Sequence, residues 1–193
     1  MIGANVPRRL ASTAAPAAML LLLAAADAPR REVDAADPGL GRARGVLYLR
    51  GAPFTGRVVE RRADGSLAGV TPYAAGRRHG TVLAWYAGGA PRHRRRYVRG
   101  REDGAHAGWW EDGSRRFAYR FRDGFAEGVA REWLRDGTPY REARYRRGRE
   151  AGLQRMWWPD GTLRASYVVR DGRRYGLLGS KGCTGDEGKG GDG

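Results

Sequence analysis

The stretch GAHAGWWEDGSRRFAYRFRDGFAE, residues 104–127, decides the fold, because it is the clearest copy of a unit that recurs along the chain. Three glycines of this unit return with a period of 24 residues. The first belongs to the series Gly56, Gly80, Gly104, Gly128, Gly152 and Gly176. The other two belong to the series Gly65, Gly89, Gly113, Gly137, Gly161 and the series Gly76, Gly100, Gly124, Gly148, Gly172. A fixed period of this length is the signature of a repeat array.

Each unit contains a two-residue turn at its ninth and tenth positions. These turns are Asp64-Gly65, Gly88-Gly89, Asp112-Gly113, Asp136-Gly137 and Asp160-Gly161. Asp-Gly and Gly-Gly suit type I′ turns, in which both central residues take positive φ, and the flanking segments have the length of strands. The third glycine would then turn the chain into the next hairpin. The sequence predicts an all-β fold, an elongated, twisted antiparallel sheet of about five stacked 24-residue β-hairpins at 56–79, 80–103, 104–127, 128–151 and 152–175.

The position of the turn predicts which residues face each other across a hairpin. In residues 104–127 this rule pairs Trp109 with Arg116, Gly108 with Phe117, and Gly104 with Phe121. The first glycine of four units then lies opposite an aromatic residue, which predicts an aromatic ring packed over that glycine. The more apolar face is expected to be the core side, with Tyr73, Tyr97, Phe121, Tyr145, Tyr86, Trp110, Leu134 and Trp158.

The opposite face is the candidate binding surface, because it gathers tryptophans and arginines in columns. Its predicted residues are Trp85, Arg92, Arg96, Trp109, Arg116, Arg120, Trp133, Arg144, Trp157 and Arg164. Tryptophan beside arginine at cross-strand distance predicts a cation–π ladder, worth about 0.5–1 kcal/mol per exposed pair. The alternative is that the tryptophan column only stabilises the sheet, since aromatic residues favour strands by themselves.

The charge of the chain points to anionic partners. The net charge is +15, from 36 lysines and arginines against 21 acidic residues. The segment 56–175 holds 27 arginines and 14 acidic residues, so the repeat array is the basic part. Such an excess attracts lipid head groups, nucleic acid or acidic proteins.

The segments outside the array predict an exported protein. Residues 1–28 have the pattern of a signal peptide, with Arg8-Arg9, an apolar core over 14–26 and Ala-x-Ala cleavage patterns. This pattern predicts a periplasmic or secreted protein, and an uncleaved membrane anchor is the alternative. Residues 29–45 are expected to be a disordered polar linker, residues 46–176 the repeat domain, and residues 177–193 a flexible Gly-rich tail with the single cysteine, Cys183.

The repeats resemble the MORN family (membrane occupation and recognition nexus) in its bacterial variant. Residues 53–56, PFTG, and residues 171–183, DGRRYGLLGSKGC, are similar to segments of YwqK-type toxin–antitoxin antitoxin proteins. The resemblance covers about residues 46–183. It implies an elongated sheet of β-hairpins that binds protein partners or membranes, and it raises an antitoxin-like role.

No constellation of residues in the sequence indicates catalysis. His79, His93 and His106 occupy different positions in their units, so they form no column of metal ligands. The aspartates that recur at the turns have the chemistry of turn residues, and no phosphate-binding glycine motif is present. We therefore expect no enzyme activity, no metal, no cofactor and no small-molecule substrate.

Three functions remain for comparison. The leading hypothesis is a non-enzymatic binding scaffold that contacts an anionic protein or lipid partner through the face of arginines and tryptophans. The alternative is an antitoxin-like inhibitor of a toxin protein. Binding of nucleic acid would use the same charge and aromatic residues, but the predicted export argues against it.

Overall fold

The computed structural model describes residues 31–177, which form β-strands and turns without a helix. The predicted signal peptide, all of the tail except Leu177, and Cys183 lie outside the described residues. The hairpin strands are β5 (Gly56–Arg61), β6 (Leu67–Ala74), β8 (Gly80–Trp85), β9 (Pro91–Val98), β11 (Gly104–Trp109), β12 (Arg115–Arg122), β14 (Gly128–Trp133), β15 (Pro139–Arg146), β16 (Arg149–Trp157) and β17 (Leu163–Arg170). The shorter strands are β1 (Glu32–Asp34), β7 (Arg77–Arg78), β10 (Arg101–Glu102), β13 (Phe125–Ala126) and β18 (Arg173–Leu177).

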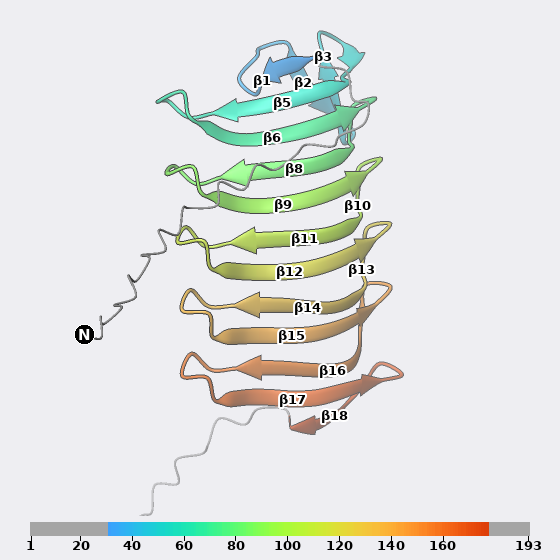
Figure 1. Cartoon of the computed structure of the whole chain (residues 1–193). Helices are drawn as coiled ribbons and strands as arrows, with labels where there is room; N and C mark the ends of the chain where they lie inside the picture. The colour runs from blue at the N-terminus through green and yellow to red at the C-terminus, as the bar shows by residue number, and fades with distance from the viewer. Residues whose placement is uncertain (1–30, 178–193) are drawn as a thin grey trace, which may run out of the picture.

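These strands form one open sheet of 15 strands in the order β1-β5-β6-β8-β9-β11-β12-β14-β15-β16-β17-β18. The pairs β6–β7, β9–β10 and β12–β13 extend it at one end of the hairpins. All the hairpin pairs are antiparallel, and Figure 1 shows them stacked in chain order along the length of the molecule. The predicted all-β fold, an elongated sheet of five repeated hairpins, is confirmed.

The Asp-Gly turns differ from the predicted type I′ geometry. Gly113 has a φ of 85°, whereas Asp112 is absent from the residues with positive φ. The N–H of Gly113 donates to the Trp110 carbonyl at 3.0 Å, and the N–H of Trp110 donates to the Ser114 carbonyl at 2.9 Å. This is a type I turn followed by one left-handed glycine. The Asp112 carboxylate accepts the Ser114 N–H at 2.8 Å, which holds the turn.

The type I′ turns lie at the other end of each hairpin, at the third glycine of the unit. Arg99 and Gly100 have φ values of 48° and 85°, and Asp123 and Gly124 have values of 52° and 88°. The turn at Asp123 joins β12 directly to β13, where Arg122 pairs with Phe125. The predicted reversal at this glycine is therefore present, and it has the geometry that the sequence suggested for the opposite end.

A β-bulge next to each Asp-Gly turn changes the predicted pairing there. Gly104 pairs with Phe121 and Gly108 with Phe117, as predicted, but Trp109 pairs with Arg115. Arg116 is the extra residue between these pairs. The same shift occurs in all five hairpins. Because a bulge places two residues opposite one, it redirects one side chain per hairpin.

In residues 104–127, the first glycine is not covered by the aromatic ring that the sequence predicts for it. A Cβ atom added at Gly104 would meet the Cδ atom of Arg96 at 3.2 Å, and no atom of Phe121 is among its nearest neighbours. Gly104 has a φ of 75°, a backbone conformation that side chains disfavour. In this unit the ring that lies over a glycine is Phe117, because a Cβ atom at Gly108 would stand 2.6 Å from its Cζ atom.

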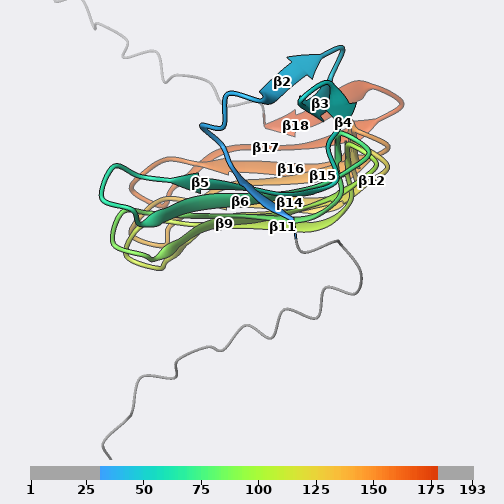
Figure 2. The same ribbon diagram turned by 90° about the horizontal axis from the view of Figure 1, so that it is seen from above.

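The N-terminal end of the sheet is covered by a second, smaller sheet. Its strands are β2 (Leu40–Ala43), β3 (Val46–Leu49) and β4 (Ala52–Pro53). Figure 2 shows this small sheet on one side of the single main layer. Leu47, Leu49, Phe54 and Tyr73 form a buried cluster between the two sheets. The first repeat therefore gains a hydrophobic core that a lone layer lacks.

The linker predicted at 29–45 contains ordered strands. Strand β1 runs parallel to β5, and Val33 pairs with Val58. Strand β2 pairs with β3, and Leu40 lies opposite Leu49. The disorder expected for this segment was therefore wrong for the residues of β1 and β2. Composition suggested a linker, but Val33 and Leu40 pack against the buried cluster.

Candidate functional site

The two faces of the main sheet differ in composition, and the confirmed register assigns each strand residue to one of them. We call the face with Trp85, Trp109, Trp133 and Trp157 the Trp face, and the face with Tyr73, Tyr97, Phe121 and Tyr145 the Tyr face. Residues paired across strands share a face, so Arg96, Arg120 and Arg144 lie on the Trp face through their pairs with Thr81, Ala105 and Val129.

The Trp face is strongly basic. We count here the residues of each hairpin from its first glycine to the residue that pairs with that glycine, for example from Gly104 to Phe121. The charged residues of the Trp face there are Arg57, Arg61, Arg94, Arg96, Arg115, Arg120, Arg131, Arg144, Arg155 and one acid, Glu142. The same span of the Tyr face holds Arg95 and Arg141 against Glu60 and Glu132. All nine arginines of the Trp face except Arg57 are exposed. The single layer therefore presents one basic face and one face of balanced charge.

The tryptophan column lies among these arginines. Trp85, Trp109, Trp133 and Trp157 are each partly buried. They pair with Pro91, Arg115, Pro139 and Leu163 rather than with the arginines of the predicted ladder. No cation–π contact within residues 31–177 involves these four rings. The predicted ladder on the Trp face was therefore wrong.

Three of the predicted surface arginines lie against aromatic residues of the Tyr face. The guanidinium carbon of Arg92 lies 5.9 Å from the centre of the Tyr86 ring. Arg116 lies 4.6 Å from the Trp110 ring, and Arg164 lies 4.5 Å from the Trp158 ring. All three arginines occupy bulge positions. The bulge is thus the physical reason why Arg92, Arg116 and Arg164 are separated from the rest of the predicted surface.

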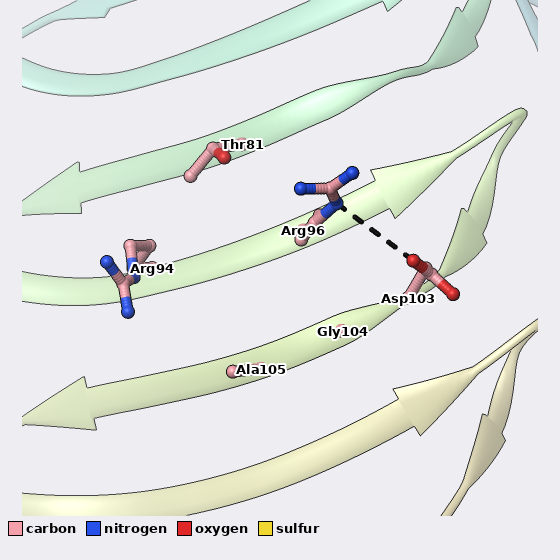
Figure 3. A pocket seen from close by; sticks show the side chains of 6 residues that line it. All are labelled: Thr81, Arg94, Arg96, Asp103, Gly104 and Ala105. Atoms are coloured by element: carbon pink, nitrogen blue, oxygen red, sulfur yellow. Dashed lines mark ion pairs between the residues drawn. The ribbon is translucent and has the colours of Figure 1, made fainter. Parts of the chain in front are cut away.

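A hollow of about 320 Å³ on the Trp face is lined by Arg96 of the predicted surface and by Arg94. Figure 3 shows Arg94 and Arg96 projecting from β9 beside Thr81 of β8 and Ala105 of β11. The Nε atom of Arg96 lies 3.9 Å from the Asp103 carboxylate. Arg94 has no acidic partner within 4.0 Å among the described residues. Two guanidinium groups and a hydroxyl group can together hold an oxyanion.

Sequence reasoning missed six arginines of the Trp face, namely Arg57, Arg61, Arg94, Arg115, Arg131 and Arg155. The two-residue alternation of a strand would have found Arg94, Arg131 and Arg155 once the Trp column was chosen. Arg115 depends on the bulge, which places it opposite Trp109.

The Tyr face contains the more buried polar residues. His106 is 2% exposed, and its Nε2 atom lies 2.8 Å from the Arg96 carbonyl. Burial lowers the pKa of His106, while the hydrogen bond to Arg96 opposes that shift. Gln154 stands at the equivalent position two units later and donates from Nε2 to the Arg144 carbonyl at 2.9 Å. Each side chain satisfies a carbonyl group of the neighbouring strand.

The recurring turn aspartates have structural partners. The pKa of Asp112 is lowered by its hydrogen bonds to the Ser114 hydroxyl and N–H groups, and Asp160 bonds Thr162 in the same way. No group of three His, Cys, Asp or Glu residues that could hold a metal ion occurs in the described part of the chain. Residues 31–177 also contain no helix that is long and apolar enough to cross a membrane.

Comparison with known proteins adds no family. Neither a scan against protein-family models nor a search of curated proteins finds a match for this chain.

Proposed function

We propose that the chain is a non-enzymatic binding scaffold whose Trp face contacts an anionic partner, in the manner of the MORN repeats that its units resemble. The observation that carries this proposal is the unequal charge of the two faces. Nine arginines and one glutamate occupy the Trp face over the span where the Tyr face has two of each sign. A surface of one charge attracts and orients partners of the opposite charge.

The spacing of the repeats favours lipid head groups over a single acidic protein. Successive hairpins are two strands apart, so equivalent side chains recur about every 10 Å along the sheet. Arg96, Arg120 and Arg144 form one such series. A periodic row of arginines fits a surface on which negative charges also recur. Tryptophan beside these arginines suits the boundary between head groups and acyl chains.

Co-sedimentation with phospholipid vesicles tests this proposal, using two triple variants that remove the same charge from opposite faces. The variant Arg96→Gln/Arg120→Gln/Arg144→Gln changes the Trp face, and Arg92→Gln/Arg116→Gln/Arg164→Gln changes the Tyr face. Each basic residue near an anionic membrane contributes about 1 kcal/mol. We therefore expect the Trp-face variant to bind vesicles that contain phosphatidylglycerol roughly 100-fold more weakly.

The Tyr-face variant is the matched control and should retain most of the binding. Binding should also weaken with added salt and disappear on neutral phosphatidylcholine vesicles. Equal losses in both triple variants, or binding that is insensitive to salt, would contradict a role for the Trp face. Saturable binding of an acidic protein without vesicle binding would assign the face to a protein partner instead.

We also propose that the protein acts outside the cytoplasm, because residues 1–28 have the pattern of a signal peptide. Mass spectrometry of the mature protein tests this point. An N-terminus between residues 25 and 30 would support cleavage and export. An intact N-terminus in a cytoplasmic fraction would favour the antitoxin-like alternative.

A further inference from the structure

A second hollow, of about 530 Å³, lies on the opposite face of the sheet and is distinct from the proposed membrane-binding surface. It runs across β9, β12 and β14 on the Tyr face, and we call it the Tyr-face groove. Strand β9 contributes Arg92 and Arg95, and β12 contributes Arg116, Phe117 and Tyr119. Its volume falls in the range of sites that bind small molecules.

One end of the Tyr-face groove is cationic. Arg92, Arg95 and Arg116 all line it, and none of the three has a carboxylate within 4.0 Å among residues 31–177. His93 lies between two of them, and burial followed by the charge of Arg95 lowers its pKa to about 4. This histidine is therefore neutral near pH 7. The cationic end thus consists of guanidinium groups that no acidic residue neutralises.

Aromatic rings hold these guanidinium groups in place. The Arg95 group lies 5.6 Å from the centre of the Phe117 ring, and the Arg116 group lies 4.6 Å from that of Trp110. The Phe117 and Tyr119 rings stack with centres 5.0 Å apart. A guanidinium group that lies over a ring still has N–H groups at its edge, which can bind a carboxylate or phosphate through two hydrogen bonds.

At the opposite end of the groove the positive charge is balanced by a carboxylate, and part of the lining is apolar. Glu132 lies 3.8 Å from Arg141, and burial, followed by the neighbouring Glu132 carboxylate, raises the pKa of the Tyr119 phenol. Trp133, Leu134 and Tyr140 also line the groove, and the Trp133 carbonyl accepts the Trp110 indole N–H at 3.3 Å. A ligand would therefore place its negative charge near β9 and its apolar body over β12 and toward β14.

We infer that the Tyr-face groove binds a small aromatic oxyanion, a molecule in which a phosphate or carboxylate group is attached to an aromatic ring. The anion would contact Arg92, Arg95 and Arg116, and the ring would lie against Phe117 and Tyr119. Charge complementarity supports the anionic group, and the stacked rings beside it support the aromatic body.

Isothermal titration of the full chain with phenyl phosphate at low ionic strength tests this inference. We expect saturable binding of one molecule per chain, and inorganic phosphate should bind about tenfold more weakly because it lacks the ring. Arg95→Gln and Arg116→Gln should each weaken the binding of phenyl phosphate about tenfold, since each removes charge-assisted hydrogen bonds. Phe117→Leu should reduce the preference for phenyl phosphate over phosphate.

Arg170→Gln is the control, because it removes an exposed arginine of β17 that lies outside the groove. Its affinity for phenyl phosphate should equal that of the parent, and circular dichroism should show the same strand content for all variants. The inference would be overturned if Arg170→Gln and Arg95→Gln lost the same affinity for phenyl phosphate. It would also be overturned if phosphate and phenyl phosphate bound equally well, or if no saturable binding occurred. Since vesicle binding is assigned to the Trp face, each result is independent of that proposal.

Discussion

The Phe117 ring lies directly over Gly108, where an added Cβ atom would stand 2.6 Å from Cζ and closer still to Cε1. Gly108 is buried, so an added methyl group there must displace the ring toward the groove that it lines. We expect Gly108→Ala to push the ring away from Arg95 and Tyr119 and to lower the free energy of unfolding by about 1–3 kcal/mol. Urea denaturation measures this change. Gly41→Ala is the control, because nothing lies within 4 Å of a Cβ atom there. A Gly108→Ala variant as stable as this control would contradict the position of the ring.

The second hairpin lacks the turn aspartate that the other four share. At its place stands Gly88, which has open space around an added Cβ atom and no positive φ. Gly88→Asp should let a carboxylate accept the Ala90 N–H group, as Asp112 accepts that of Ser114. We expect a stabilisation of about 0.5 kcal/mol from the reduced freedom of the unfolded chain alone, seen as a higher melting temperature. Gly89→Asp should instead destabilise, because Gly89 has a φ of 79°.

The gain from Gly88→Asp should depend on pH in a definite direction. The hydrogen bonds at the equivalent residues lower the pKa of Asp64, Asp112 and Asp160. A carboxyl group with a lowered pKa in the folded state stabilises above its pKa in the unfolded state and loses this effect as the pH falls through the folded value. The difference in melting temperature between Gly88→Asp and the parent should therefore shrink below about pH 4. A difference that grows on acidification would contradict the expected hydrogen bond.

His93 should make the fold sensitive to mild acid. Burial, followed by the charges of Arg95 and Arg92, lowers its pKa from 6.5 to about 4. Between these values the unfolded chain binds a proton that the folded chain does not, so stability falls as the pH drops from 6.5 toward 4. We expect His93→Gln to flatten the pH dependence of the urea midpoint in this window. His79→Gln, which changes an exposed histidine, is the control for the removal of a histidine side chain. Equal profiles for the parent and His93→Gln would show that His93 is accessible to protons in the folded state.

The pairing far from the turns could be predicted from sequence, and the pairing next to them could not. Gly104 and Phe121 are partners as expected, because register follows from the alternation of side chains. Both turn glycines follow an aspartate in residues 104–127, so Asp-Gly alone does not separate the two turn types. The residue that follows does separate them. Serine or threonine follows the second glycine in four units and can bond the turn aspartate, whereas Phe125 follows Gly124 and begins a strand.

This local difference decided how much of the candidate site was predicted correctly. The turn with a bulge places Arg116 over the Trp110 ring, away from the column of Trp109. Arg96, Arg120 and Arg144 lie farther from the turn than the bulge, so the sequence assigned them to the correct face. The ordered strands before residue 46 were missed for another reason. Their few apolar residues gain burial only from the cluster around Phe54, which composition does not show.

Neighbouring tryptophans on opposite faces offer a test of the proposed membrane contact that leaves the charge unchanged. Trp109 pairs with Arg115 on the Trp face, whereas the Trp110 ring lies under Arg116 on the Tyr face. If tryptophan rings enter the head-group region, then Trp109→Leu/Trp133→Leu should weaken binding to anionic vesicles severalfold. Trp110→Leu/Trp158→Leu removes two rings from the Tyr face and should retain vesicle binding, although it loses the cation–π contacts to Arg116 and Arg164. Urea denaturation separates any loss of stability from a loss of affinity. The opposite ranking of the two double variants in vesicle binding would move the membrane contact to the Tyr face.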